Sequence, residues 1–385
     1  ILVINKSDLL EEDIDPKAYS EKIIPYVEAG LTTFDMADHY GSSELIVGEY
    51  NLNNSTSDVQ LLTKWVPKPG KVDKQSVSDA VQLALDRMKQ TSIDLMQYHA
   101  WHYPDPSWLD ALFYLTELKQ EGLIKNIGVT NFDAAHLRVA CASGIPIVSN
   151  QISHSLIDQR ANSSKIIDVC NEYGIKLLAY GVVMGGFLTN KWLNKNEPKP
   201  ENLKTWSEMK YKRFIDESGG WDAYQNLLNV VNQIAQNNDV SIANICSRYI
   251  LENPLVAGII IGARLGENNH IKDNLNILKT KISKEEINLI RDAQKELNPI
   301  PGDCGDEYRK PPYLTASGDL SHHFQEIPKI YDSNILVEGR EHVSSNTKWE
   351  ELASYSRAVK YKDRIVVSGT TATHNEKVIG KNDPI

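Results

Sequence analysis

Short apolar, β-prone runs alternate with longer amphipathic stretches along this 385-residue chain, and this alternation restricts the fold more than any other feature. Such repeated strand–helix units build a parallel sheet with right-handed crossovers. The expected strands are residues 32–35, 60–63, 94–97, 126–129, 148–151, 176–180 and 258–261, with residues 2–4 as a weak eighth.

The stretches between these strands carry the apolar spacing of helices that bury one face. Helices are expected over residues 17–29, 77–89 and 108–120, and glycines such as Gly174 stand where a helix gives way to the next strand. Seven strands and a weak eighth favour a closed (β/α)8 TIM barrel with a degenerate first strand. A doubly wound open sheet is the alternative, although no Rossmann glycine fingerprint follows any of the strands.

Composition excludes several classes of function. A net charge of −10 without a cluster of Lys and Arg argues against nucleic-acid binding. The longest apolar run, residues 255–263, is far short of the roughly 20 residues of a membrane helix. No cysteine pair has metal-ligand spacing, so we expect no metal site, reduced thiols and a cytoplasmic protein. The oligomeric state stays open. The cysteines are Cys141, Cys170, Cys246 and Cys304.

The alternation stops near residue 300, which predicts a division into three parts. Residues 1–300 form the barrel, and residues 301–335, rich in Pro and Gly, form a linker or extended arm. Residues 336–385 begin a second, β-rich domain that the chain does not complete. There, residues 364–368 and 377–379 flank a turn region and predict a β-hairpin.

Four polar residues lie at or just after the ends of expected strands: Asp35, Tyr40, Lys64 and His99. In a barrel these ends gather at one mouth, where active sites lie. A carbonyl that accepts hydride needs a proton at its oxygen, which Tyr40 is placed to supply. A neighbouring Lys64 cation lowers the pKa of a phenol, Asp35 supplies its counter-ion, and His99 orients the substrate.

Simpler interpretations remain for each of these side chains, because any one of them alone is more often structural. Asp38 and His39 share the loop of Tyr40 and are expected to be solvated, and His102 is an alternative to His99. Trp65 and Trp101 flank the mouth, where they line an apolar substrate pocket or pack in the core. Residues 190–220 are expected to cover the mouth.

The sequence resembles the aldo-keto reductase superfamily over residues 15–300. The resemblance rests on Asp35 and Tyr40 with the following Gly41, on the strand-end Lys64 and His99, and on further motifs in the same order. These motifs are Gly128-Val129-Thr130-Asn131-Phe132, Asn150-Gln151, Leu178-Ala179-Tyr180 and Ile261-Gly262-Ala263-Arg264.

The resemblance implies a TIM barrel that reduces a small-molecule carbonyl substrate with NADP(H). It implies that Thr130, Asn131 and Gln151 hold the nicotinamide carboxamide and that Tyr180 stacks on the ring. The loop that starts at Gly181 would follow the pyrophosphate. Arg264 would face the 2′-phosphate, which favours NADP over NAD, or it forms a surface ion pair. Asn274 would lie near the adenine.

Two departures from the family pattern lead to an alternative function. Residues 1–5 stand where the family has a Gly-rich first strand, and Gly181 replaces a polar residue that is common there. The alternative is a cofactor-binding, redox-sensing module with little turnover. The C-terminal part resembles the start of a RidA-like (reactive intermediate deaminase) domain, through residues 355–359 and 366–370. Without the rest of that domain we assign no imine hydrolysis to the chain.

Overall fold

The structure is a computed structural model that describes most of the chain. The described residues are 1–3, 15–54, 59–68, 70–101, 103, 105–262, 265, 270–309, 333–337, 339–345, 347–369, 373–374 and 377–378.

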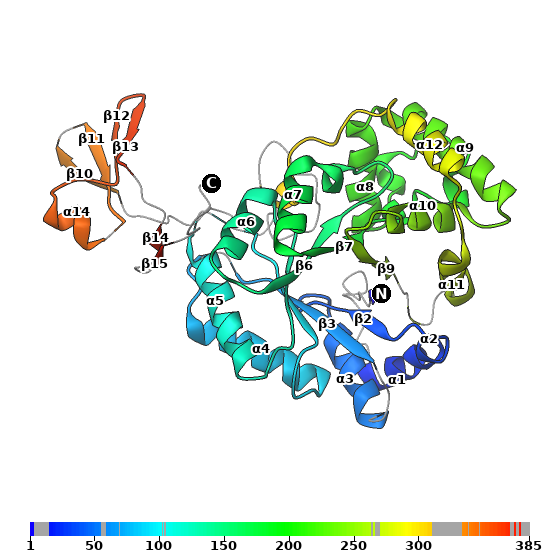
Figure 1. Ribbon diagram of the computed structural model, residues 1–385, viewed down its shortest axis with the longest axis horizontal. Helices are drawn as coiled ribbons and strands as arrows, with labels where there is room; N and C mark the ends of the chain where they lie inside the picture. The colour runs from blue at the N-terminus through cyan, green and yellow to red at the C-terminus, as the bar shows by residue number, and fades with distance from the viewer. Residues whose placement is uncertain are drawn as a thin grey trace.

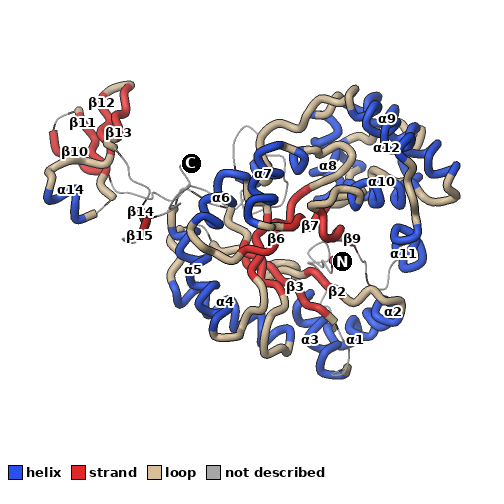
Figure 2. Tube along the Cα trace, in the orientation of Figure 1, coloured by secondary structure: helices blue, strands red, loops and turns tan. Residues whose placement is uncertain are grey.

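A curled parallel sheet forms the centre of the protein, as Figures 1 and 2 show. Neighbours in the sheet are also neighbours along the chain, so each strand is followed by a helix that returns outside the sheet. The strands are β2 (Thr33–Asp35), β3 (Gln60–Trp65), β4 (Leu95–Tyr98), β5 (Ile127–Thr130), β6 (Ile147–Ser153), β7 (Lys176–Tyr180) and β8 (Val256–Ile259). The predicted α/β architecture, consistent with a (β/α)8 barrel, is confirmed, and the open-sheet alternative is not needed.

The first strand is short but paired on both sides. β1 (Leu2–Val3) runs parallel to β2 and to β9 (Ile261–Gly262), and only Ile260 separates β9 from β8. The sheet therefore returns on itself through β8 and β9. Ile1 adds to this closure by packing with Leu62, Leu95 and Leu178 in an apolar cluster.

Helices cover the outer face of the sheet (Figure 1). The barrel helices are α1 (Pro16–Ser20), α2 (Ile24–Glu28), α3 (Ser43–Asn53), α4 (Lys74–Met88), α5 (Ser107–Gln120), α6 (Ala134–Ala142), α7 (Ser164–Tyr173), α8 (Trp206–Glu217), α9 (Gly220–Asn237), α10 (Ile242–Leu251), α11 (Ile271–Lys279), α12 (Lys284–Gln294) and α13 (Asp306–Arg309). Short 3-10 turns are η2 (Glu21–Ile23), η3 (Arg160–Asn162), η4 (Met184–Gly186), η5 (Asn190–Trp192) and η6 (Pro200–Asn202).

The helix predicted over residues 17–29 is broken into α1, η2 and α2. Pro25 occupies the first turn of α2, where its missing N–H costs nothing, but the same proline cannot continue a preceding α-helix. The helices predicted at 77–89 and 108–120 correspond to α4 and α5, each starting one to three residues earlier.

Two apolar cores support the barrel. The larger lies between the strands and α3–α7, and it includes Phe34, Ile127 and Leu112. The second joins α8, α9, α10 and α12 to the 3-10 turn that follows β7, through residues such as Phe214 and Tyr224. This second core fixes α8 beside the C-terminal end of β7, which matters for the site described below.

The C-terminal part forms a separate antiparallel sheet of β10 (Ser333–Val337), β11 (Arg340–Val343), β12 (Ala358–Tyr361) and β13 (Arg364–Val367), with helix α14 (Lys348–Leu352). The predicted hairpin between residues 364–368 and 377–379 is wrong. β13 pairs with β12 through a turn in which Lys362 has φ 56°, and β15 (Lys377–Val378) pairs with β14 (Thr373–His374). The sequence did not predict the turn between β12 and β13, because Lys362 stands at a left-handed position where Asn or Gly is usual.

All four cysteines are buried and unpaired. Among the described residues, none of the helices has both the length and the apolar character needed to span a bilayer.

Candidate active site at the carboxyl ends of the strands

The four residues predicted to carry chemistry lie at one end of the barrel. Asp35 ends β2, Lys64 is the penultimate residue of β3, and His99 directly follows β4. Tyr40 lies in the loop between β2 and α3. Because all these strands run in parallel, their carboxyl ends meet at one mouth.

A buried ion pair forms the floor of this mouth. The Lys64 ammonium donates to the Asp35 carboxylate and, at 2.9 Å, to the carbonyl oxygen of Met36. Asp35 also accepts amide hydrogens from Gln97 at 2.8 Å and Gln151 at 3.0 Å. Both charges are thus hydrogen-bonded as well as paired, which a buried ion pair needs to offset desolvation.

Tyr40 lies above the ion pair. The Lys64 Nζ is 5.0 Å from the centre of its ring. Burial raises the pKa of Tyr40, and Lys64, whose effect is smaller, lowers it. The net shift of the pKa is therefore upward rather than the predicted lowering, because burial of the phenol outweighs the effect of the Lys64 cation. The phenol is accordingly protonated at neutral pH, the state that a proton donor requires.

His99 is only 5% exposed and lies between the ion pair and the next strand. Burial, followed by the Arg309 cation, lowers its pKa well below the usual range. Its Nε2 is 3.2 Å from the side-chain amide nitrogen of Asn131. A neutral imidazole in this place can accept or donate one hydrogen bond, as a substrate-orienting group must.

The burial of His99 predicts how stability depends on pH. Below pH 6.5 the unfolded chain takes up a proton at this histidine that the folded protein excludes, so stability falls as the pH is lowered. The slope from one such group is at most about 1.4 kcal/mol per pH unit. In urea titrations from pH 7 to pH 5, His99→Gln should show a shallower decline than wild type. Equal slopes for wild type and His99→Gln would contradict the prediction.

Several of the residues expected at a cofactor lie together beside His99. Thr130 ends β5, and its hydroxyl is buried without a hydrogen-bond partner. Asn131 follows in a left-handed conformation, with φ 55°. The Tyr180 hydroxyl at the end of β7 donates to the Asn131 side chain at 2.8 Å. A buried hydroxyl without a partner, next to an amide and an aromatic ring, fits a planar carboxamide-bearing ring.

The remaining predicted cofactor residues are spread more widely. The Gln151 amide nitrogen is committed to Asp35 and, at 2.8 Å, to Gln97. Gly181, with φ 72°, lies against the Tyr211 ring so closely that a Cβ would collide with it. Asn274 lies in α11. Arg264 and His102 lie outside the described residues.

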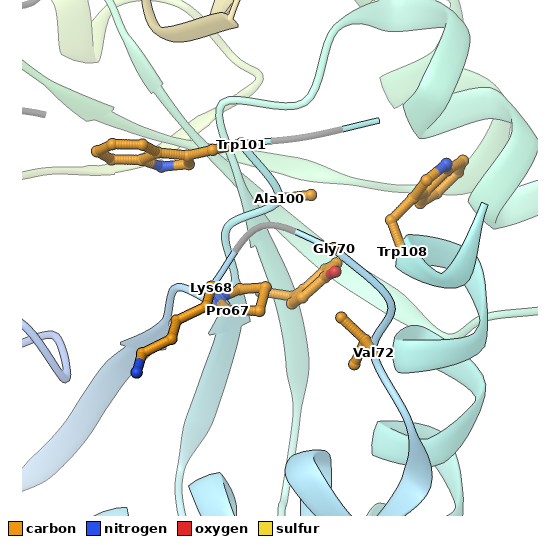
Figure 3. A pocket seen from close by; sticks show the side chains of 8 residues that line it. Pro67, Lys68, Gly70, Val72, Ala100, Trp101 and Trp108 are labelled. Atoms are coloured by element: carbon orange, nitrogen blue, oxygen red, sulfur yellow. The ribbon is translucent and has the colours of Figure 1, made fainter. Parts of the chain in front are cut away.

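The two tryptophans differ in their surroundings. Trp65 belongs to the large apolar core, and its ring packs 5.4 Å from Tyr98. Trp101 lies at the mouth, 5.2 Å from the His99 ring. Figure 3 shows Trp101 on the rim of a small pocket beside the loops that follow β3 and β4. This pocket is lined by Pro67, Lys68, Gly70, Val72, Tyr98, Ala100, Trp101 and Trp108.

Sequence reasoning missed several polar residues at the mouth. Gln97 has a weak signal, because it precedes the strand-end His99. Lys210 comes from α8, within the segment expected to cover the mouth, and its ammonium donates to the Tyr308 hydroxyl at 2.6 Å. Tyr308 and Arg309 come from the segment predicted to be a linker. Among the described residues, no cluster of three His, Cys, Asp or Glu side chains is arranged to hold a metal ion.

Comparison with known proteins agrees with this geometry. A sequence model of the aldo/keto reductase family matches residues 10–295, which include every strand-end residue discussed above. The chain belongs to the aldo/keto reductase family. It is therefore an oxidoreductase of a family that reduces small-molecule carbonyl groups with nicotinamide cofactors.

Individual relatives are distant but cover most of the barrel. The chain is 23% identical over 289 residues to the chloroplastic pyridoxal reductase of Arabidopsis thaliana, covering 70% of this chain and 74% of the relative. It is 24% identical to the NADH-specific methylglyoxal reductase of Escherichia coli, covering 74% and 90%. The glycerol dehydrogenase of Gluconobacter oxydans shares the fold, with a TM-score of 0.64 at 20% identity over 78% of this chain and 93% of the other.

Proposed function

We propose that this protein reduces an aldehyde or ketone to an alcohol with NADP(H), and that Tyr40 is the proton donor. The observation that carries the proposal is the position of Tyr40 above the buried Lys64–Asp35 pair, with His99 at the same mouth. A phenol, a lysine cation with its counter-ion and a neutral imidazole are together what protonation of a carbonyl oxygen requires.

The side chains divide the work as follows. His99 orients the substrate oxygen by a hydrogen bond, and Tyr40 transfers its hydroxyl proton to that oxygen. The Lys64 cation stabilises the phenolate that remains, and Asp35 is the counter-ion of Lys64 in the barrel interior. The reduced nicotinamide supplies the hydride when bound. The surrounding side chains exclude water, which strengthens each of these interactions.

The same proposal assigns the cofactor residues. Thr130, Asn131 and Gln151 would hold the carboxamide, and Tyr180 would lie against the ring. Gly181 would lie along the pyrophosphate, Arg264 at the 2′-phosphate and Asn274 near the adenine. The buried, unpartnered Thr130 hydroxyl supports the first assignment. Because Gln151 already donates to Asp35, its contribution would come through its remaining hydrogen-bonding positions.

The preference for NADP over NAD rests on Arg264 and is directly testable. A guanidinium that binds the 2′-phosphate should make NADPH bind about tenfold tighter than NADH or better, since such charge-assisted bonds contribute roughly 1.5–3 kcal/mol. Fluorescence titration of the purified protein with both dinucleotides measures this, and Arg264→Gln should remove the difference. Equal binding of NADPH and NADH by wild type would overturn the NADP assignment. This outcome is worth testing because one relative is by name NADH-specific.

The same titration, combined with an assay of turnover, distinguishes an enzyme from the alternative redox-sensing module. Tight NADPH binding with turnover of a panel of small aldehydes and ketones supports the enzyme. Tight binding with negligible turnover over that panel supports the sensor. The relatives act by name on pyridoxal and on methylglyoxal, so the panel should span aromatic and small dicarbonyl substrates.

We also propose a barrel domain that ends near residue 300, an arm over residues 301–335 whose first residues pack back on the barrel through α13, and a cytoplasmic location. The family match ends at residue 295, close to the proposed boundary, and the four buried free thiols suit a reducing compartment. For residues 336–385 we propose a RidA-like domain. Its support is the antiparallel sheet β10–β13 and the buried Glu350, which accepts hydrogen bonds from Ser345 and Arg357.

A further inference from the structure

Residues 303–309, here called the mouth segment, lie on the barrel mouth although they are part of the expected linker. Cys304, Asp306 and Glu307 are each no more than 6% exposed. The Tyr308 ring lies 5.5 Å from the His99 ring and 5.4 Å from Trp101. The segment thus contacts the residues assigned to substrate and cofactor.

Charged contacts hold the mouth segment from one side. The Glu307 carboxylate accepts a hydrogen bond from Arg160 at 2.7 Å and lies 3.7 Å from Lys210. Burial alone would raise the pKa of Glu307, but the Arg160 and Lys210 cations hold it at about 2. Arg160 is in turn bound by Asp158 through two nitrogens. This network of ion pairs and hydrogen bonds is buried, and it fixes the segment in place.

Arg309 holds the segment from the other side, and its contacts reach the site itself. Its guanidinium donates to the carbonyl oxygen of Ala100 at 3.1 Å and to that of Asn131 at 2.7 Å. Ala100 follows His99 on the loop after β4, and Asn131 begins the loop after β5. Arg309 therefore joins two neighbouring loops whose side chains, His99 and Asn131, contact each other. Its own side chain is only 6% exposed.

The backbone of Asn131 is left-handed, and the Arg309 contact is one of the hydrogen bonds that hold it. A φ of 55° is uncommon for a residue with a side chain and costs on the order of 1 kcal/mol or more. The Asn131 N–H donates to Gln151 at 2.8 Å, and its carbonyl accepts from Arg309. Gly305 packs against the same peptide so closely that a Cβ would lie 2.8 Å from the Asn131 Cβ.

We propose that Arg309 is a positioning residue of the active site, which fixes Asn131 and His99 so that Asn131 can meet the nicotinamide end of the cofactor. This inference rests on the proposed function. Arg309 touches neither substrate nor cofactor, and it acts through the two carbonyl groups that it binds. The planar guanidinium of arginine carries several N–H donors and binds both carbonyl oxygens at once, whereas a lysine ammonium cannot reach both oxygens in the same geometry.

The test compares binding of the whole cofactor with binding of a part that lacks the nicotinamide. The probes are NADPH and 2′-phospho-ADP-ribose, titrated against the full chain. Arg309→Lys should weaken NADPH binding about tenfold, the equivalent of one well-made hydrogen bond to a charged group. It should leave binding of 2′-phospho-ADP-ribose and the thermal midpoint close to wild type. Gly305→Ala should give the same selective loss, because its Cβ would collide with the Asn131 carbonyl oxygen and with the Arg309 guanidinium that binds this oxygen.

Arg248→Lys is the matched control, because Arg248 forms an ion pair with Glu252 on the surface of α10. It should change neither affinity. Equal NADPH binding by wild type, Arg309→Lys and Gly305→Ala would overturn the inference while leaving the proposed function intact. Parallel loss of both probes would also overturn it, since that pattern marks a general structural defect. A wild-type protein that does not bind NADPH would overturn the proposed function and this inference with it.

Discussion

Tyr40→Phe should reduce kcat for carbonyl reduction by about 10²–10⁴-fold, the usual contribution of a positioned proton donor. The substitution removes one hydroxyl and keeps the ring that lies 5.0 Å from the Lys64 ammonium. Packing around the ring is therefore unchanged, and NADPH affinity should stay at the wild-type value. Steady-state kinetics with an active aldehyde, together with a cofactor titration, measures both quantities.

A second tyrosine gives the control for this experiment. Tyr26 belongs to α2, the helix before β2, and is buried in the barrel core away from the mouth. Tyr26→Phe should leave kcat within a factor of about two of wild type, because it removes no group from the site. If Tyr40→Phe kept its full rate, the proton would have to come from another group, and the assignment of Tyr40 would be wrong.

Periodicity and strand-end residues predicted the barrel because both depend on local sequence. An apolar run of four to six residues between helices is buried on both faces of a parallel sheet, and such runs located β2 to β8 within three residues at either end. The side chains directly after these runs, such as Lys64 and His99, then had to meet at one end. Parallel topology leaves no other arrangement for them.

The mouth segment was not predictable in the same way, because nothing in its own sequence reveals its partners. Gly302 and Gly305 stand in a stretch rich in proline and glycine, which is typical of a linker. Gly305 is instead required by a close contact with Asn131, which is 174 positions earlier in the chain. The contacts of Glu307 with Arg160 and of Tyr308 with Lys210 also join distant parts of the chain, 147 and 98 positions apart. Only the folded barrel brings these residues together.

The pairing of β1 shows a similar limit. Leu2–Val3 is too short for a strong signal, and it lacks the glycine expected at this position. Leu2–Val3 forms a strand because it pairs with the backbone edges of β2 and β9, and not because its own residues strongly favour a strand. The raised pKa of Tyr40 is also a property of the fold, since it follows from burial, which outweighs the effect of the Lys64 cation, and from the nearby Asp35 charge.

Lys64→Met should destabilise the barrel by about 3–5 kcal/mol, the usual cost of removing one partner from a buried ion pair. The two side chains are 2% and 1% exposed, so the Asp35 carboxylate would remain in the barrel interior, where the described side chains that still donate to it are Gln97 and Gln151. Urea unfolding at pH 7 measures the loss. Lys74→Met is the surface control, since Lys74 and Glu117 are 62% and 47% exposed and solvent screens their pair, so the free energy of unfolding should stay close to wild type.

Adding Asp35→Asn to Lys64→Met separates the structural role of the pair from its catalytic role. The double variant leaves no unpaired charge in the barrel, so it should recover most of the lost stability. It should not recover activity, because the cation that stabilises the phenolate of Tyr40 is still absent. Recovery of both stability and rate would mean that the pair serves only the fold. Failure to recover stability would mean that Lys64 supports the barrel by packing rather than by charge.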